Sequence, residues 1–195
     1  MTNMKLQLDG VALVTAAAGG IGRAVALQFV HDGCTSLVLS DLKAADLHET
    51  VAMALAVNAN ASVKAYPGDV TSEDFVKDLV GFVLQVFGRL DYVSNGVGTT
   101  GVPGPTHEME TASYDQVLDI NTKSLWVCER EEIRSMMAQE PLDTSFGPAR
   151  GAIVNVSSVM GILALPDCAP YIISKHGENS VITIELERAK FLLID

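Results

Sequence analysis

The stretch Val14–Gly22, "VTAAAGGIG", decides the fold. It follows a short apolar run at residues 11–16 and precedes a helical pattern. A glycine-rich turn from a buried strand into a helix lets the backbone approach a phosphate, toward which the first N–H groups of the helix point. Gly20 and Gly22 lie at this turn, whereas Ala16 stands where such loops have their first glycine. The stretch therefore predicts a dinucleotide-binding strand–helix unit with one altered position.

Short apolar runs alternate with longer helical patterns along the rest of the chain. Continuous apolar strands are typical of a sheet covered on both faces, and strand–helix alternation is typical of right-handed crossovers between parallel strands. We therefore expect an α/β fold, a doubly wound parallel sheet of the Rossmann type, in a single domain over residues 1–195. The expected strands span residues 11–16, 36–41, 62–67, 90–95 and 152–158, and the expected helices lie near residues 20–32, 43–57, 72–87, 111–138 and 169–190.

The end of the chain differs from what this pattern predicts. The last expected helix is followed only by "FLLID", residues 191–195. A parallel sheet normally continues beyond a strand as apolar as residues 152–158. We therefore expect the last strands of the sheet to be missing, so that this strand forms an uncovered edge.

The composition limits the classes of function. The net charge of −11 argues against binding to nucleic acid or to anionic lipid, because both need a basic surface. No apolar run reaches about 18 residues, the length that indicates a membrane span, so we expect a cytoplasmic protein. The three cysteines are widely spaced and no histidine lies at ligand spacing, so we expect no metal site.

Asp41 ends the second expected strand, 19 residues after Gly22. A carboxylate at this place accepts hydrogen bonds from the ribose hydroxyls of an adenosine and repels a 2′-phosphate. No lysine or arginine lies between Thr15 and Gly22 or directly after Asp41. This arrangement favours NAD over NADP, and the alternative interpretation is a solvated acid at the end of a strand.

Tyr171 and Lys175 form a second pattern, "YIISK". Residues four apart share one face of a helix. A phenol ordinarily has a pKa near 10, and a neighbouring ammonium favours the phenolate. The pair therefore predicts a general acid/base, although the same spacing also arises by chance in sequences of this length.

Two further polar residues accompany this pair. Ser158 lies 13 residues before Tyr171, at the carboxyl end of the fifth expected strand, where a hydroxyl can stabilise charge on a substrate oxygen. Ser157 competes for this role, but strand alternation directs the two side chains to opposite sides. Asn121 lies inside a long expected helix, where asparagine is mildly unfavourable, which favours a functional role over a structural one.

Together these residues resemble the short-chain dehydrogenase/reductase family. "TAAAGGIG", residues 15–22, is similar to its TGxxxGxG motif, and "GDV", residues 68–70, is similar to its adenine-contacting motif. The family's catalytic tetrad is matched in order and spacing by Asn121, Ser158, Tyr171 and Lys175.

The resemblance implies an NAD(P)-dependent oxidoreductase that interconverts a secondary alcohol and a ketone by hydride transfer. Tyr171 would be the general acid/base that exchanges a proton with the substrate oxygen, and Lys175 would favour its phenolate and hold the nicotinamide ribose. Ser158 would orient the substrate oxygen, and Asn121 would hold a water that relays protons from Lys175. Contacts with the cofactor are implied for Thr15, Gly20, Ile21, Gly22, Asp41, Asp69, Val70, Asn95, Tyr171 and Lys175.

The sequence departs from the family pattern at three places. Ala16 replaces a glycine, the family's NNAG is "SNGV" at residues 94–97, and the chain stops after the tetrad helix. The last departure keeps open an alternative, a truncated non-catalytic chain that retains cofactor binding or has a regulatory role. A third possibility, an extended-type sugar-nucleotide epimerase, is disfavoured because that branch spaces its glycines differently and adds a C-terminal substrate domain.

The expected partners are a small alcohol or carbonyl substrate, whose identity the sequence does not give, and a second copy of the chain. The helices near residues 111–138 and 169–190 are where this family usually associates, so the resemblance implies a homodimer through them.

Overall fold

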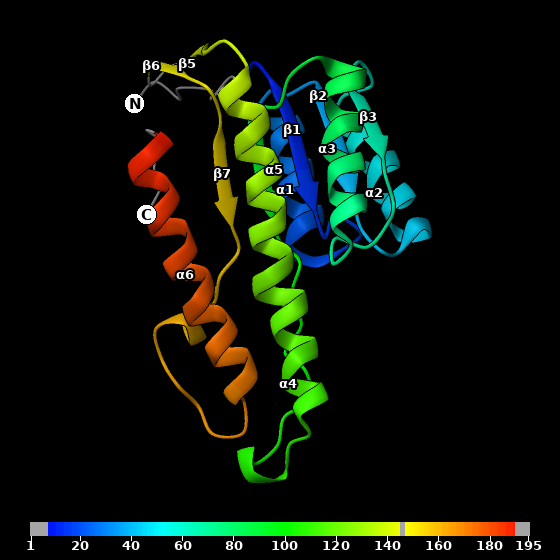
Figure 1. The fold of residues 1–195 in the computed structure, drawn as a ribbon. Coiled ribbons are helices and arrows are strands. Elements are labelled where there is room, and N and C mark those ends of the chain that lie inside the picture. The colour runs from blue at the N-terminus through cyan, green and yellow to red at the C-terminus, as the bar shows by residue number, and fades with distance from the viewer. Residues whose placement is uncertain (1–7, 145–146, 190–195) are drawn as a thin grey trace, which may run out of the picture.

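The computed structural model describes residues 8–144 and 147–189, with side chains as far as residue 179. Its central feature is a parallel sheet in the order β3-β2-β1-β4-β7, which confirms the predicted α/β fold (Figure 1). The strands of this sheet are β1 (Val11–Thr15), β2 (Ser36–Ser40), β3 (Ser62–Ala65), β4 (Tyr92–Asn95) and β7 (Ala152–Asn155). Among the described residues, β7 is an edge strand, and "FLLID" lies outside them.

Helices cover both faces of the sheet (Figure 1). On one face, α1 (Gly20–His31) and α2 (Ala44–Val57) pack with Ala12 and Val14 of β1. On the other face, α3 (Glu73–Phe87) and α5 (Ser124–Ala138) pack with Leu13 of β1. Both alternating sets of β1 side chains are therefore buried, as expected for a parallel strand between two helical layers.

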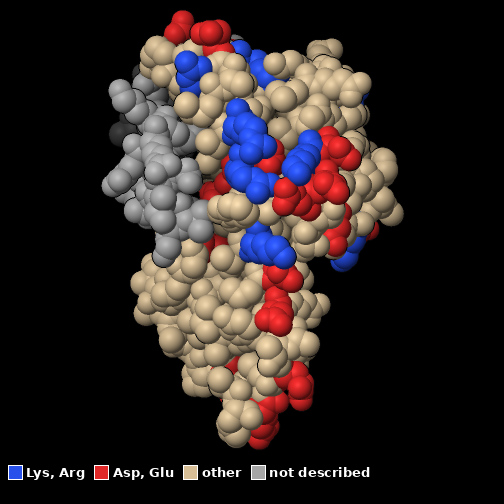
Figure 2. All heavy atoms as spheres, in the orientation of Figure 1, with Lys and Arg blue, Asp and Glu red and all other residues tan. Residues whose placement is uncertain are grey.

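The outer surface of α3 and α5 carries charges of both signs. Figure 2 shows basic and acidic side chains side by side on this face. Arg130 pairs with Glu73 at 2.9 Å, Lys77 pairs with the same carboxylate at 2.9 Å, and Arg134 pairs with Glu131 at 2.7 Å. The basic side chains of this cluster are therefore balanced by acids and do not form a uniformly basic patch.

The helix expected near residues 111–138 is divided. It consists of α4 (Thr111–Leu118), a π-helical segment η2 (Asp119–Lys123) and α5. A π-helical turn inserts an extra residue into a helix, and such turns are frequent at functional sites. Asn121 lies in the middle of this turn and is fully buried.

The end of the fifth strand also differs from expectation. β7 ends at Asn155, and Ser158 begins a short 3-10 helix, η3 (Val159–Gly161), by accepting a hydrogen bond from the N–H of Met160 at 3.1 Å. This capping bond competes with continuation of the strand. The last described helix, α6 (Ala169–Ala189), follows η3 and packs beside α5.

Three further small elements were not predicted. A 3-10 helix, η1 (Thr106–Glu108), lies in the loop before α4. An antiparallel pair, β5 (Leu142–Thr144) and β6 (Gly147–Ala149), lies between α5 and β7. Among the described residues, no helix is both long and apolar enough to cross a bilayer.

The turn from β1 into α1 has a strained and crowded backbone. Ala16 has a φ of 54°, in the left-handed region that is unfavourable for alanine. Gly22 lies against the carbonyl group of Ala16, and a Cβ at Gly22 would lie far inside contact distance of that oxygen. The two positions therefore have different requirements. Any side chain at position 22 would clash with the carbonyl of Ala16, whereas position 16 requires only a residue that tolerates a positive φ.

A buried polar network joins the sheet to α5. Asn95, at the end of β4, donates to Glu132 Oε2 at 3.0 Å and to Asn155 Oδ1 at 3.2 Å. Asn155 in turn donates to Oε1 of Glu129. Burial raises the pKa of Glu132 from 4.5 to about 8, the hydrogen bond from Asn95 lowers it, and the charge of Glu129 raises it further. Glu132 therefore favours the protonated form inside the folded chain.

The Glu132 carboxyl makes the stability depend on pH. Because its pKa is higher in the folded chain than in the unfolded chain, its stabilising effect is complete below about pH 4 and is lost as the pH rises through about 8. Urea unfolding should show a free energy that falls between these values, by at most about 1.4 kcal/mol per pH unit. Glu132→Gln should reduce this fall in the free energy of unfolding, whereas Glu131→Gln should keep it. Parallel pH profiles for wild type and Glu132→Gln would contradict the assignment.

Replacing Ala16 should relieve backbone strain. A left-handed alanine costs about 1–2 kcal/mol, and glycine returns about 0.5–1 kcal/mol as unfolded-state entropy. We therefore expect Ala16→Gly to raise the free energy of unfolding by up to about 1 kcal/mol, measured by urea denaturation. The control is Ala17→Gly, because Ala17 is fully buried and outside the left-handed region, so the same change should destabilise the chain. Equal losses in both variants would show that the φ of Ala16 carries no strain.

Candidate functional site

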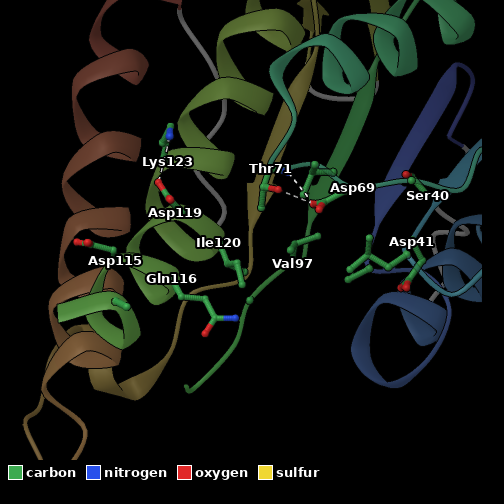
Figure 3. A pocket seen from close by; sticks show the side chains of 17 residues that line it. Ser40, Asp41, Asp69, Thr71, Val97, Asp115, Gln116, Asp119, Ile120 and Lys123 are labelled. Atoms are coloured by element: carbon green, nitrogen blue, oxygen red, sulfur yellow. Dashed lines mark hydrogen bonds and ion pairs between the residues drawn. The ribbon is translucent and has the colours of Figure 1, made fainter. Parts of the chain in front are cut away.

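A cavity of about 760 Å³ opens at the carboxyl ends of β1, β2 and β4 (Figure 3). Figure 3 shows Asp41 on one side and Gln116 and Ile120, from α4 and η2, on the other. Doubly wound sheets bind ligands at this end, where the strand order reverses. The cavity therefore lies where the sequence predicts a dinucleotide, and its wall includes Ala16, Asp41, Asp69, Val70, Gly96 and Gly98.

The glycine loop presents an open helix N-terminus beside this cavity. The N-cap residue of α1 is Gly19, which has no side chain to cap the first turn. Gly20 has a φ of 52°, and a Cβ there would meet open space, so glycine is needed for conformation and not for room. Ile21 is 65% exposed. The uncapped N–H groups and the helix dipole together suit an anionic group such as a pyrophosphate.

Arg23 fastens this loop to α2 and was not singled out from the sequence. Its guanidinium donates to the carbonyl of Ala18 at 2.6 Å, to Thr50 Oγ1 at 3.0 Å and to Glu49 Oε2 at 2.8 Å. The positive charge nearest to the loop in sequence is therefore paired with Glu49. Arg23 thus stabilises the backbone of the glycine loop and does not neutralise Asp41. The carboxylate of Asp41 is therefore the charge that lies next to the loop in the cavity wall.

The two carboxylates predicted to contact the adenosine both line the cavity. Asp41 accepts from the N–H of Ala18 at 3.0 Å through Oδ2 and from the N–H of Lys43 at 3.0 Å through Oδ1. Asp69 accepts from the N–H and the hydroxyl of Thr71 at 2.9 and 2.8 Å. Each carboxylate thus accepts two hydrogen bonds from within the chain, which fixes its orientation before any ligand binds.

Thr15 and Asn95 lie beneath the cavity and do not line it. Thr15 donates to Asn95 Oδ1 at 3.4 Å and accepts from the N–H of Gly96 at 3.1 Å. Both side chains are buried and join β1 to β4. They support the cavity floor from below, and a direct contact with a cofactor remains a prediction for these two residues.

The structure brings Asn121 to the helix that carries Tyr171 and Lys175. Asn121 Nδ2 donates to Ser174 Oγ at 2.9 Å and to the carbonyl of Thr99 at 2.9 Å, while its Oδ1 accepts from the N–H of Thr99 at 2.8 Å. Ser174 donates to the carbonyl of Tyr171 at 2.7 Å. Asn121 therefore ties the π-helical turn and the loop after β4 to the first turns of α6.

Lys175 is almost fully buried, with 4% of its surface exposed. Its Nζ lies 5.8 Å from the centre of the Tyr171 ring and donates to the carbonyl of Val156 at 3.0 Å. The same atom donates to Glu178 Oε2 at 2.8 Å. Sequence reasoning missed Glu178, because its spacing of three from Lys175 has meaning only when both side chains are known to be buried.

The two serines at the end of β7 have different partners. Ser157 donates to Asn179 Oδ1 at 2.8 Å and so contacts α6. Ser158 accepts from the N–H of Met160, which leaves its own hydroxyl proton available for a different acceptor. Both serines follow the end of β7, so strand alternation does not account for their different directions. Contact of Ser158 with a substrate stays a prediction.

Gly98 connects the cavity with this polar group. It lies in the cavity wall, and a Cβ there would lie 3.5 Å from Asn121 Oδ1 and 3.6 Å from Lys175 Nζ. A ligand that extends from Asp41 along the loop after β4 therefore reaches the region of Lys175. Of the predicted site residues, Asp41, Asp69 and Val70 line the cavity. The residues of the glycine loop from Gly20 to Gly22 and the four tetrad residues are not among its described lining, and their contact with a cofactor stays a prediction.

The chain is similar in sequence and in fold to known dehydrogenases. A 3β-hydroxysteroid dehydrogenase of Mediterraneibacter gnavus is 35% identical over 173 residues, which cover 89% of this chain and 58% of that enzyme. A short-chain dehydrogenase/reductase of Burkholderia phymatum in complex with NAD has a TM-score of 0.84 at 28% identity, with coverage of 95% and 62%. A metagenomic short-chain oxidoreductase in complex with NADP has a TM-score of 0.81 at 29% identity, with coverage of 94% and 77%.

The chain spans 58–66% of the length of the first curated relatives that it matches. The family model of short chain dehydrogenases matches residues 10–187, which is nearly the whole of the chain. This match, together with the parallel sheet and the relatives above 30% identity, shows that the chain belongs to the short-chain dehydrogenase family.

Proposed function

We propose that this chain is an NAD-dependent oxidoreductase that interconverts a secondary alcohol and a ketone, with Tyr171 as the general acid/base. The observation that carries the proposal is the position of Gly98, which lines the Asp41 cavity and lies beside both Asn121 and Lys175. A dinucleotide held at Asp41 by its adenosine end would thereby extend to Tyr171 and Lys175 with its nicotinamide end. The name of the relative from Mediterraneibacter gnavus, 3β-hydroxysteroid dehydrogenase, indicates that it acts on a secondary alcohol.

Cofactor binding is supported by the residues around the cavity. Asp41 offers a carboxylate to the adenosine ribose, Asp69 and Val70 offer the adenine wall, and Gly20, Ile21 and Gly22 offer backbone N–H groups to the pyrophosphate. The cavity also contains Asp115 and Asp119, and its single lysine, Lys123, is paired with Asp119 at 3.1 Å. Among the described lining residues, no cation other than the paired Lys123 could neutralise a 2′-phosphate placed against Asp41, and this is the basis for proposing NAD over NADP.

When bound, the nicotinamide supplies or accepts the hydride. In the proposed reaction, the Tyr171 hydroxyl exchanges a proton with the substrate oxygen, and the Lys175 ammonium favours the phenolate and binds the ribose. The Ser158 hydroxyl donates a hydrogen bond to the substrate oxygen and stabilises the negative charge that develops there. Asn121 holds α6 and the loop after β4 in register, so that these groups keep their spacing.

A homodimer through the helical face is part of the proposal. Large apolar side chains remain exposed on α5 and α6: Trp126 at 48%, Met137 at 53% and Ile173 at 47%. Burial of such side chains favours association. A cytoplasmic location also remains a prediction, based on the sequence composition.

The cofactor preference can be measured by fluorescence titration of the 195-residue chain with NADH and NADPH. We expect NADH to bind at least about tenfold more tightly, because a 2′-phosphate would face Asp41 without a cation. Asp41→Asn should weaken NADH binding and reduce the preference. Asp115→Asn makes the same change in charge across the cavity and should leave the preference in place. No detectable binding of either nucleotide would overturn the proposal.

The acid/base role is tested by removing a single oxygen atom. Tyr171→Phe should lower the rate of NADH formation from secondary alcohols by at least about 100-fold, the usual contribution of a positioned acid/base, while the Kd for NADH changes little. The control is Tyr114→Phe, because Tyr114 is an exposed residue of α4. Equal rates in the two variants would exclude Tyr171 from the chemistry. NADH binding without turnover in the wild-type chain would instead favour the non-catalytic alternative.

A further inference from the structure

Lys175 and Glu178 form a buried ion pair on α6. Lys175 Nζ lies 2.8 Å from Glu178 Oε2, and the two residues are 4% and 1% exposed. They are separated by three positions on one helix, so their side chains share a face. Charged side chains are almost never buried to this extent unless they are paired. Each charge therefore compensates the other inside the chain.

The surroundings give Glu178 little other stabilisation. Among the described residues, its second oxygen, Oε1, is buried and has no hydrogen-bond partner. The pKa of this carboxyl lies above its usual 4.5, because burial raises it by more than the hydrogen bond and the charge of Lys175 lower it. Removing one member of a buried pair is costly because the remaining charge is left uncompensated. The Glu178 carboxylate thus stabilises the buried Lys175 ammonium, and the ammonium stabilises the buried carboxylate.

We propose that Glu178 is a positioning residue that restrains Lys175, so that NAD binding has to displace the Lys175–Glu178 ion pair. The inference rests on the proposed function, in which Lys175 binds the nicotinamide ribose. In this view, Glu178 lowers the affinity of the chain for its cofactor.

The donor groups of the ammonium explain the competition. An ammonium has three N–H donors. Two of them are directed to the carbonyl of Val156 at 3.0 Å and to Glu178 Oε2 at 2.8 Å. A ribose that takes two hydrogen bonds from Lys175 has to replace at least one of these acceptors. The carbonyl of Val156 belongs to the backbone at the end of β7, so the side chain of Glu178 is the acceptor that can move.

The same contact changes the electrostatics around Tyr171. The ammonium lies 5.8 Å from the centre of the Tyr171 ring, and a carboxylate in direct contact with it offsets much of its charge at that distance. When the ion pair opens, the positive charge acts on the phenol without this compensation. Cofactor binding and activation of Tyr171 would therefore be coupled through Glu178.

Glu178→Gln tests the inference through NADH affinity measured by fluorescence titration. Glutamine keeps the length of the side chain and an acceptor for Lys175, but it removes the charge that retains the ammonium. We expect the Kd for NADH to fall by about tenfold, the effect of no longer having to break one charge-assisted hydrogen bond. Glu131→Gln makes the same change in net charge on α5, away from Lys175, and should change the Kd by less than about twofold.

A second pair of variants isolates the contact with Lys175. In a Lys175→Met background, adding Glu178→Gln should give no further tightening of NADH binding, because the restrained group is gone. Circular dichroism verifies that each variant folds. If Glu178→Gln does not fold, Glu178→Met provides an apolar replacement of similar length with the same expected fall in Kd.

The outcomes separate this inference from the proposed function. Wild type that binds NADH as tightly as Glu178→Gln would overturn the restraint and leave cofactor binding intact. A gain in affinity that also occurs in Glu131→Gln, or that persists without Lys175, would overturn it as well. If neither wild type nor Glu178→Gln binds NADH, the proposed function fails and the inference fails with it.

Discussion

The close approach of Gly22 to the carbonyl group of Ala16 is the constraint on which the site depends. It sets how sharply the chain turns from β1 into α1, and therefore where the uncapped end of α1 lies relative to the sheet. Two other contacts hold the same turn: Asp41 accepts from the N–H of Ala18, and Arg23 donates to the carbonyl of Ala18. A loop fixed from three sides can keep Ala16 at a positive φ, because the surrounding contacts offset the local strain.

The carboxyl end of the sheet is held together by polar groups that are unusual for a core. Thr15, Asn95 and Asn155 link β1, β4 and β7, and Glu132 joins this row to α5. A hydrogen bond offsets the desolvation cost of each buried polar atom that is paired, and the carboxyl of Glu132 is accommodated by retaining its proton. The network aligns the ends of β4 and β7. Val156 is the next residue after β7, and its carbonyl accepts a hydrogen bond from Lys175.

Features that depend on the order and spacing of residues along the chain could be predicted from the sequence. Features that depend on which side chains are buried or hydrogen-bonded could not. The alternation of apolar strands and helices predicted the parallel sheet, and the spacing from Gly22 to Asp41 predicted a carboxylate beside the glycine loop. The π-helical turn at Asn121 was not predicted, because the residues of "DINTK" fit an ordinary helix. Strand 152–158 was expected to be longer, because its composition does not reveal that Ser158 caps η3. Thr15 and Asn95 belong to motifs of the family, yet their side chains support the cavity from below.

Lys175 shows why a motif alone does not define a site. The spacing of Tyr171 and Lys175 places both on one face of a helix, and this holds for any helix with that sequence. What the ammonium can do depends on the acceptors around it, which come from the residue that follows β7 and from the next turn of α6. A backbone carbonyl alone would leave its charge acting on the phenol. A buried carboxylate next to it converts the same lysine into half of an ion pair, whose opening then contributes to the energetics of every ligand that needs Lys175. The chemistry of this site is therefore set as much by Glu178 as by the motif that identifies the family.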